Sequence, residues 1–165
     1  MQLLIRKACT DDAAAILAIL NPIIESEAVA FDVPLREEDE CKYIAGFPSR
    51  GVFNVALRRS DGRLVGLQSM EPFASYSRRF DHVGVLGTYV DASCRRRGVA
   101  TRLFEATFAA ARLKGYEKLF TYIREDNPAA LATYGGQGFR TVGRAERHLK
   151  VDGRYVAEII VERFL

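Results

Sequence analysis

Residues that ligate metals or form disulfides are scarce in this chain of 165 residues. It contains two histidines, His82 and His148, and three widely spaced cysteines, Cys9, Cys41 and Cys94, with no CxxC pair. Structural zinc sites and disulfide frameworks need clustered ligands or paired cysteines. The sequence therefore predicts reduced thiols, as in a cytoplasmic protein, and no metal site.

Long apolar segments are also missing. The longest strictly apolar run covers residues 13–20, well short of the roughly 20 residues that a membrane span needs. The apolar N-terminal stretch is followed at once by Arg6 and Lys7, whereas a signal peptide carries its positive charges before its apolar segment. We therefore expect a cytoplasmic protein with no membrane partner.

Charge of one sign is not in large excess. Lys and Arg number 24 and Asp and Glu number 21, which gives a net charge of +3. A duplex nucleic-acid binder usually carries a larger and more clustered excess, so no nucleic-acid partner is expected. What the chain does contain, 48% hydrophobic residues with ten Phe and seven Tyr, is enough for one globular domain over residues 1–165.

Hydrophobic periodicity and turn residues predict an α/β fold built around a mixed sheet. Residues 10–12 are expected to cap a first helix, in which Pro22 marks a kink or a break. Strands are predicted at residues 3–6, 52–58, 64–70, 83–90 and 119–123. A last pair of strands brackets Asp152-Gly153; the first of them starts at residues 139–142 and the second covers residues 155–161. Helices are predicted at residues 16–23, 36–43, 99–114 and 128–134. No internal repeat and no long linker divides the chain.

One loop carries the features of an anion site. It follows a strand, precedes the best-patterned helix, and consists of Arg95, Arg96, Arg97, Gly98, Val99, Ala100 and Thr101. A helix N-terminus offers free N–H groups to a phosphate, and a glycine lets the backbone come close to it. Three consecutive arginines are also typical of a solvated surface, so two interpretations remain. Neither a Walker-type loop nor a G-x-G-x-x-G motif is present.

Two other features allow a structural or a functional interpretation. Gly84 and Gly87 interrupt a strand, either because a ligand lies along it or because bulky neighbours need the room. Asn127 before Pro128 is a typical helix cap, and Tyr134 closes that helix shortly before Gly138-Phe139. A tyrosine taken alone is more often a core residue than a proton donor.

These features together, in this order, resemble the GNAT superfamily of acyl-CoA-dependent N-acetyltransferases. The family's phosphate loop, [RQ]-x-x-G-x-[GA], is matched by Arg95, Gly98 and Ala100. Its later signature is matched by Asn127, Ala130, Tyr134, Gly138 and Phe139. Softer matches near both ends, such as Ile5-Arg6 and Gly153-Arg154-Tyr155, resemble the phosphinothricin-acetyltransferase-like branch and extend the resemblance over nearly the whole chain.

The resemblance implies a mixed, mostly antiparallel central sheet flanked by helices, with its fourth and fifth strands splayed apart. Acetyl-CoA would be the co-substrate, with its pantetheine arm along Thr88, Tyr89 and Val90 and its pyrophosphate on the amides of residues 96–101. The resemblance gives further roles to Asn127 as a pantetheine contact, Tyr134 as the proton donor to the thiolate, and Phe31 and Asp32 as acceptor-side residues. A backbone N–H near Val90 would hold the developing oxyanion. Relatives commonly form homodimers, and no pattern in this sequence tests that expectation.

One departure from the branch leaves the general base open. The branch's usual Glu on the splayed strand is replaced by Val85. Glu71, Asp81 and His82 are the alternatives near that strand, and His82 titrates nearest neutrality. The resemblance thus implies direct acetyl transfer to the amine of a small molecule that is amino acid-like or similar. The alternatives are an acyl-CoA-binding regulatory or partner domain with little turnover, and a nucleic-acid contact module built on the three arginines.

Overall fold

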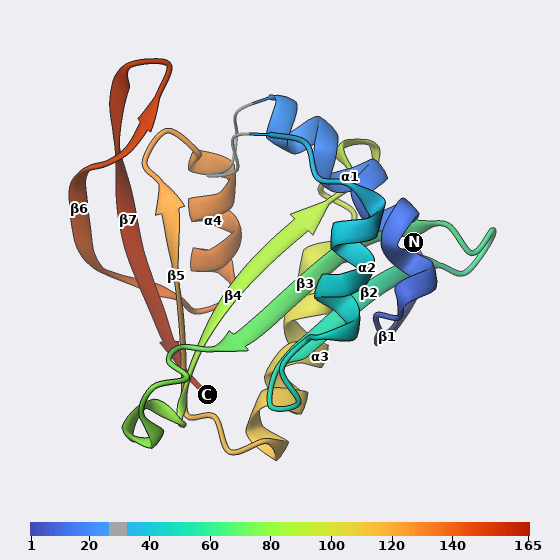
Figure 1. Cartoon of the computed structure of the whole chain (residues 1–165), viewed down its shortest axis with the longest axis horizontal. Coiled ribbons are helices and arrows are strands. Elements are labelled where there is room, and N and C mark those ends of the chain that lie inside the picture. The colour runs from blue at the N-terminus through green and yellow to red at the C-terminus, as the bar shows by residue number, and fades with distance from the viewer. Residues whose placement is uncertain (27–32) are drawn as a thin grey trace.

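The architecture, seen in a computed structural model that describes residues 1–26 and 33–165, is a seven-stranded sheet in the order β1-β2-β3-β4-β5-β7-β6 (Figure 1). All neighbouring strands are antiparallel except β4 and β5, which are parallel. This confirms the predicted mixed, mostly antiparallel sheet. The strands are β1 (Leu3–Lys7), β2 (Val52–Arg58), β3 (Leu64–Pro72), β4 (Val83–Val90), β5 (Lys118–Arg124), β6 (Arg140–Val151) and β7 (Arg154–Phe164).

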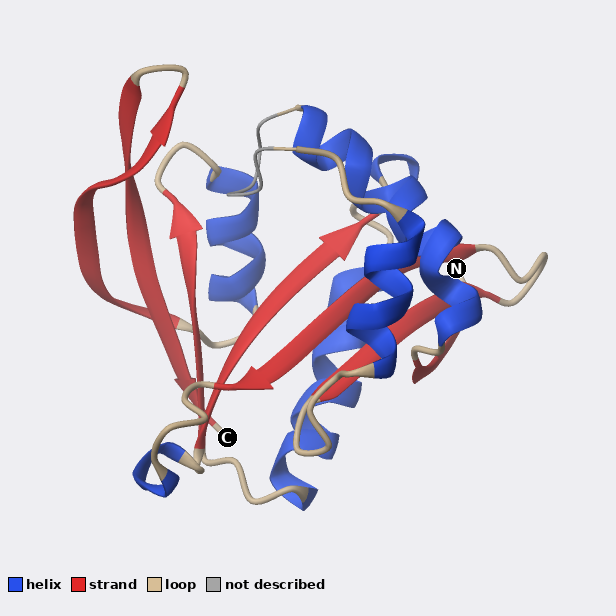
Figure 2. Ribbon diagram, in the orientation of Figure 1, coloured by secondary structure: helices blue, strands red, loops and turns tan. Residues whose placement is uncertain are grey.

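Helices cover both faces of the sheet (Figure 2). Helices α1 and α2 pack on what we call the α2 face, and α3 and α4 pack on the opposite α3 face. No helix within the described ranges is long and apolar enough to cross a membrane. The helices are α1 (Ala13–Glu25), α2 (Glu37–Ala45), α3 (Val99–Leu113) and α4 (Pro128–Gly136).

For the N-terminal helix, the expected cap and a break at Pro22 are wrong, and a kink at Pro22 stays a prediction. The Asp12 side chain does not cap α1; its carboxylate accepts hydrogen bonds from both terminal nitrogens of Arg6, at 2.6 and 2.7 Å, and from the Cys9 amide at 2.9 Å. The bond to Arg6 lowers the pKa of Asp12. Pro22 does not end α1, which continues to Glu25. Because Pro22 lies in the last turn, the amide it lacks costs the helix one bond near its end.

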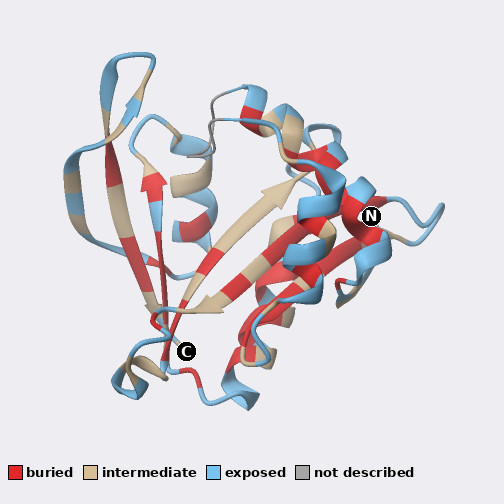
Figure 3. Ribbon diagram, viewed as in Figure 1, coloured by how far each residue is buried: buried red, intermediate tan, exposed pale blue. Residues whose placement is uncertain are grey.

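Burial divides the sheet into two parts (Figure 3). Strands β2 and β3 are buried along most of their length, because helices pack on both of their faces. Strand β6, in contrast, is exposed at most of its positions. The core therefore lies under β2–β4, and the β6–β7 hairpin forms a more open flank.

The parallel strands β4 and β5 separate after a short stretch of pairing, at a point that we call the fork. Residues 83–85 of β4 pair with residues 118–120 of β5. Beyond Val85, β4 stays with β3 while β5 continues along β7, and the two strands diverge in Figure 1. In the described chain, no strand pairs with the β5-facing edge of residues 86–90. The predicted splay of the fourth and fifth strands is confirmed.

The glycines of β4 make room for protein side chains. A Cβ atom on Gly84 would lie 2.5 Å from Met70 Sδ and 2.9 Å from a Leu119 methyl group. A Cβ on Gly87 would lie 3.2 Å from the ring of Tyr89. The packing interpretation is therefore confirmed at both positions, and a ligand along this strand stays a prediction.

Candidate active site

The loop before α3 has an open backbone. Gly98 occupies the N-cap position of α3 with φ of 80°, a left-handed conformation that favours glycine. A Cβ atom at Gly98 would meet nothing within 4 Å. The side chain of Val99 is 1% exposed and packs beside Cys94 and Leu103, which fixes the start of the helix in the core. Ala100 and Thr101 complete the first turn.

The three arginines of this loop are exposed and available to a ligand. Among the described residues, Arg95, Arg96 and Arg97 have no ion pair or hydrogen bond. Arg96 also has a positive φ of 56°, so the loop bends twice in the left-handed region. Free guanidinium groups beside the positive end of a 15-residue helix form a surface suited to phosphate groups.

Tyr134, at the C-terminal end of α4, is enclosed on the α3 face. Its side chain is 6% exposed, and its ring packs edge-on against Phe104 and Phe139, each with ring centroids 5.1 Å apart. Its hydroxyl lies 3.0 Å from the hydroxyl of Thr88 on β4. The structure thus brings together the predicted proton donor and one predicted cofactor-binding residue, from segments 46 residues apart.

Gln68 of β3 extends this contact and was missed by the sequence analysis. Its amide nitrogen donates a hydrogen bond of 2.7 Å to the Thr88 hydroxyl. Because Thr88 accepts that bond, its own proton is free to point at the Tyr134 oxygen. Gln68 is fully buried, and burial raises the pKa of Tyr134. The phenol therefore stays protonated at neutral pH while a hydrogen-bonded pair supports its oxygen.

Asn127 acts as the predicted helix cap. Its side-chain oxygen accepts a hydrogen bond of 3.1 Å from the Ala130 amide, and Pro128 occupies the first turn of α4. The cap fixes the start of the helix that carries Tyr134 near its C-terminal end.

Glu71 lies on the α2 face, in register with the last residue pair of β4 and β5 before the fork. Glu71 pairs in register with Val85, and Val85 pairs with Phe120. Directly paired residues project from the same face of a sheet. The Tyr43 hydroxyl of α2 donates a hydrogen bond of 2.5 Å to Glu71 Oε1. A carboxylate therefore sits one strand away from the position at which the branch usually carries its Glu.

The other residues predicted on the acceptor side have different outcomes. His82 is exposed in the turn before β4, and its carbonyl accepts bonds from the Glu117 and Lys118 amides, at 2.9 and 3.0 Å. It precedes Val85 by three residues, about 10 Å along an extended chain, and the structure does not bring it to Glu71. Phe31 and Asp32 lie outside the described residues.

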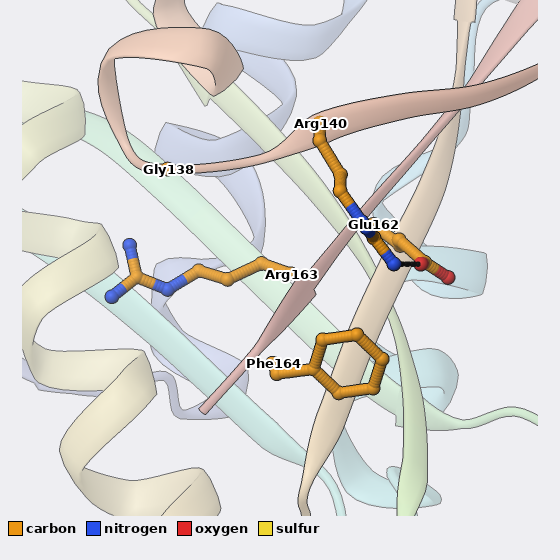
Figure 4. A pocket seen from close by; sticks show the side chains of 5 residues that line it. All are labelled: Gly138, Arg140, Glu162, Arg163 and Phe164. Carbon is orange, nitrogen blue, oxygen red and sulfur yellow. Dashed lines mark hydrogen bonds and ion pairs between the residues drawn. The ribbon is translucent and has the colours of Figure 1, made fainter.

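A surface hollow of about 250 Å³ lies elsewhere, beside the ends of β6 and β7 (Figure 4). Its lining residues are Gly138, Arg140, Glu162, Arg163 and Phe164, none of which was a predicted site residue. Arg140 and Glu162 form an ion pair of 2.8 Å there. Arg163 instead donates a hydrogen bond to the Gln137 carbonyl and lies over the ring of Phe108. These groups hold the β7 strand against α3 and α4.

Comparison with known proteins agrees with this geometry. The model of the acetyltransferase (GNAT) family matches residues 20–139. A Bacillus subtilis protein named as a phosphinothricin acetyltransferase, YwnH, is 28% identical over 152 residues, which cover 90% of this chain and 91% of that protein.

Solved structures give the same fold. The crystal structure of a protein described as a phosphinothricin N-acetyltransferase has a TM-score of 0.89 at 25% identity, with 99% of each chain covered. A phosphinothricin acetyltransferase of Sinorhizobium meliloti, in complex with acetyl-CoA, has a TM-score of 0.90 at 18% identity, covering 100% of this chain and 89% of that one. With most of its length matched by the family model, the chain belongs to the GNAT acetyltransferases and is an N-acetyltransferase.

Proposed function

We propose that this N-acetyltransferase moves an acetyl group from acetyl-CoA to the amine of a small molecule by direct attack. The observation that carries the proposal is the Tyr134 hydroxyl, 3.0 Å from Thr88 beside the open edge of β4. A proton donor enclosed on one face of the fork, and a carboxylate on the other face, are the two groups that this transfer needs.

The fit to acetyl-CoA rests on two open surfaces. The β5-facing backbone of Thr88, Tyr89 and Val90 can pair with the amide groups of the pantetheine arm. The amides of α3 and the free arginines can hold the pyrophosphate, and the space above Gly98 is empty to 4 Å. Bound there, acetyl-CoA supplies the activated thioester. Asn127 has an amide nitrogen left for the pantetheine, because its oxygen is used in the cap.

Tyr134 would donate its proton to the sulfur as the carbon–sulfur bond breaks. Thr88 accepts from Gln68 and can then donate to the Tyr134 oxygen, which gains negative charge in that step. The raised pKa of Tyr134 keeps its hydroxyl protonated at neutral pH. Gln68 and Thr88 thus act as positioning residues for the acid.

Glu71 would take the proton that the amine loses. Glu71 lies on β3 and projects from the same face as Val85 and Phe120, and the Tyr43 hydroxyl donates a hydrogen bond to one of its carboxylate oxygens. The second oxygen is free to accept a proton directly or through water. We favour Glu71 over His82, because His82 lies in an exposed turn before β4 and is not in register with Val85 and Phe120.

The alternative is an acyl-CoA-binding domain with little turnover, and the observation that favours it is Val85 at the usual Glu position. A thiol-release assay with acetyl-CoA across amino acids, polyamines, arylalkylamines and peptides separates the two functions. We expect amine-dependent release of coenzyme A. Tight acetyl-CoA binding without amine-dependent release from any acceptor would favour the alternative instead.

The cofactor assignment has its own test. Gly98→Glu places bulk and negative charge against the phosphates, and we expect coenzyme A affinity to fall at least a hundredfold by calorimetry. Gly115→Glu is the matched control, because Gly115 ends the same helix with φ of 82° and is equally open. Both variants carry the same backbone strain, so an equal effect on affinity would contradict the loop assignment. Arg95→Ala should weaken binding less, because the amides remain.

A further inference from the structure

A row of aromatic side chains crosses the α2 face beside the fork. Consecutive ring centroids are 5.2 Å apart between Phe80 and Phe73, 5.2 Å between Phe73 and Phe120, 5.7 Å between Phe120 and Tyr122, and 5.8 Å between Tyr122 and His148. These five rings, which we call the aromatic wall, come from the β3–β4 loop, β5 and β6. The wall therefore joins three segments that are distant in the sequence.

The wall passes the reacting end of the proposed site at Phe120. Phe120 pairs with Val85, which in turn pairs with Glu71, so all three project from one face. Tyr122 follows Phe120 by two residues on β5 and shares that face. An amine that reaches Glu71 would place whatever it carries against Phe120 and Tyr122.

Two of the rings are more exposed to solvent than core side chains are. Phe120 is 9% exposed, but Phe73 is 40% and Tyr122 is 43% exposed. Helices α1 and α2 lie over β2–β4 and leave this side of β5 uncovered (Figure 2). Burying such aromatic area on a ligand is favourable, and ring-on-ring contacts add to the gain.

Charge on this face suits a cation rather than an anion. Glu71 lies beside the middle of the wall, in register with Val85 and Phe120, and Glu158 lies at the His148 end, with a carboxylate oxygen 3.7 Å from His148 Nε2. The cations of the neighbouring strands already have carboxylate partners: Lys118, Arg124 and Arg140. A protonated amine is attracted here by the carboxylates and by the ring faces, whereas a carboxylate group would have to compete for these three cations with the carboxylates that already bind them.

We propose that the aromatic wall binds the acceptor, and that the acceptor is an arylalkylamine, a primary amine joined by a short aliphatic link to an aromatic ring. The amine lies at Glu71, and the ring packs against Phe73, Phe120 and Tyr122. This inference rests on the proposed function, since it names the acceptor class of the same site.

The test compares phenethylamine, n-butylamine, putrescine and phenylalanine as acceptors by steady-state kinetics. We expect the kcat/KM of phenethylamine to exceed those of the two aliphatic amines by about tenfold or more. Phenylalanine, which adds a carboxylate, should be a poorer acceptor than phenethylamine. Equal kcat/KM values for phenethylamine and n-butylamine, or a preference for phenylalanine or putrescine, would overturn the inference while leaving the acetyltransferase function intact.

Variants of Tyr122 test whether the aromatic wall causes the preference for phenethylamine. Tyr122→Leu, which removes the ring, should raise the KM for phenethylamine about five- to tenfold and leave that for n-butylamine within about twofold. Tyr122→Phe, which keeps the ring, should keep the preference for phenethylamine over n-butylamine. Tyr155→Leu is the matched control, because Tyr155 is a similarly exposed tyrosine, at 53%, near the tip of the β6–β7 hairpin.

Two further results would also overturn the inference. In one, Tyr122→Leu changes the oligomeric state by analytical ultracentrifugation with no change in acceptor selectivity, which would make the wall a contact between copies. In the other, calorimetry on the enzyme with coenzyme A finds phenethylamine bound no more tightly than n-butylamine. The calorimetric result decides the acceptor class even if no amine is acetylated.

Discussion

The two faces of the sheet at the fork differ in how far they are closed. On the α3 face, Tyr134 is 6% exposed and Gln68 is fully buried. On the α2 face, Tyr43 is 39% and Tyr122 is 43% exposed. The closed face holds one hydrogen-bonded series, Gln68, Thr88 and Tyr134, whereas the open face holds a carboxylate and exposed rings. In the function that we propose, the proton donor and the acceptor-binding residues therefore lie on opposite sides of the same strands.

The largest effect is expected on the closed face, from Tyr134→Phe. This change removes only the hydroxyl, so turnover should fall about a hundredfold with acetyl-CoA affinity nearly unchanged. Because the pKa of Tyr134 is raised, the parent enzyme should also show no loss of kcat from pH 7 to about 10. A thiol-release assay between pH 7 and about 10 measures turnover, and calorimetry measures the affinity for acetyl-CoA.

Tyr116→Phe is the control for that experiment. Tyr116 is 3% exposed, and its buried hydroxyl has no hydrogen-bond partner in the described structure. Its loss should leave turnover intact. If Tyr134→Phe also turned over at the parent rate, the thiolate would leave by another proton path, and the contrast between the two faces would fail.

A smaller effect is expected on the open face, from Glu71→Gln. The variant keeps the hydrogen bond from Tyr43 but loses the base, so kcat/KM should fall about tenfold at pH 7. The deficit should shrink as the pH rises, because free amine accumulates without help. The pH–rate profile is the measurement, and Glu38→Gln, on the exposed side of α2, is the control. An unchanged profile would remove Glu71 from the mechanism.

Thr88→Val tests the positioning pair and should cost turnover about fivefold, the loss expected for one neutral hydrogen bond to the Tyr134 oxygen. Thr107→Val is the control, because Thr107 also accepts a side-chain amide hydrogen bond, from Asn54 at 3.1 Å, away from Tyr134. Thr107 is fully buried and Thr88 is half-buried, so Thr107→Val should lose at least as much stability by thermal melting and should keep its turnover. In the Tyr134→Phe background, Thr88→Val should have no further effect on turnover, and an additive loss would disprove the coupling.

The smallest effect is expected from His82→Ala, which should change kcat/KM by less than about twofold. The side chain is exposed in a turn before β4 and has no assigned partner in the described residues. The assay at pH 6 and pH 8 measures it. A loss of about a hundredfold with the alkaline plateau removed would instead make His82 the base.

Local patterns were sufficient to predict the elements. Turn residues such as Gly62 and Gly115 have the positive φ that ends their segments, and Asn127-Pro128 begins α4 as expected. The Asp12 cap failed because a tertiary partner, Arg6, binds the carboxylate more strongly than the helix amides do. A pattern within one segment does not contain such a partner.

The site was harder to predict, because it depends on register between strands. Nothing near Gln68 in the sequence indicates that it lies opposite Thr88, and nothing near Phe120 indicates that it meets Phe73. Likewise, we favour Glu71 as the candidate general base because it pairs in register with Val85, which the sequence around Glu71 does not indicate. The fork itself was expected from the resemblance to a family, and no periodicity in the chain predicts it.

In the described part of the chain, the strand ladder between β4 and β5, which joins the two halves of the sheet, has three residue pairs, at positions 83–85 of β4. Segments joined so sparingly can open independently, with separate free energies of local unfolding. A ligand lying along both free strand edges would tie these two cooperative units together and stabilise them by mass action. In hydrogen exchange, the amides of residues 86–90 that face β5 should then be the ones whose protection changes most between the free and the acetyl-CoA-bound protein.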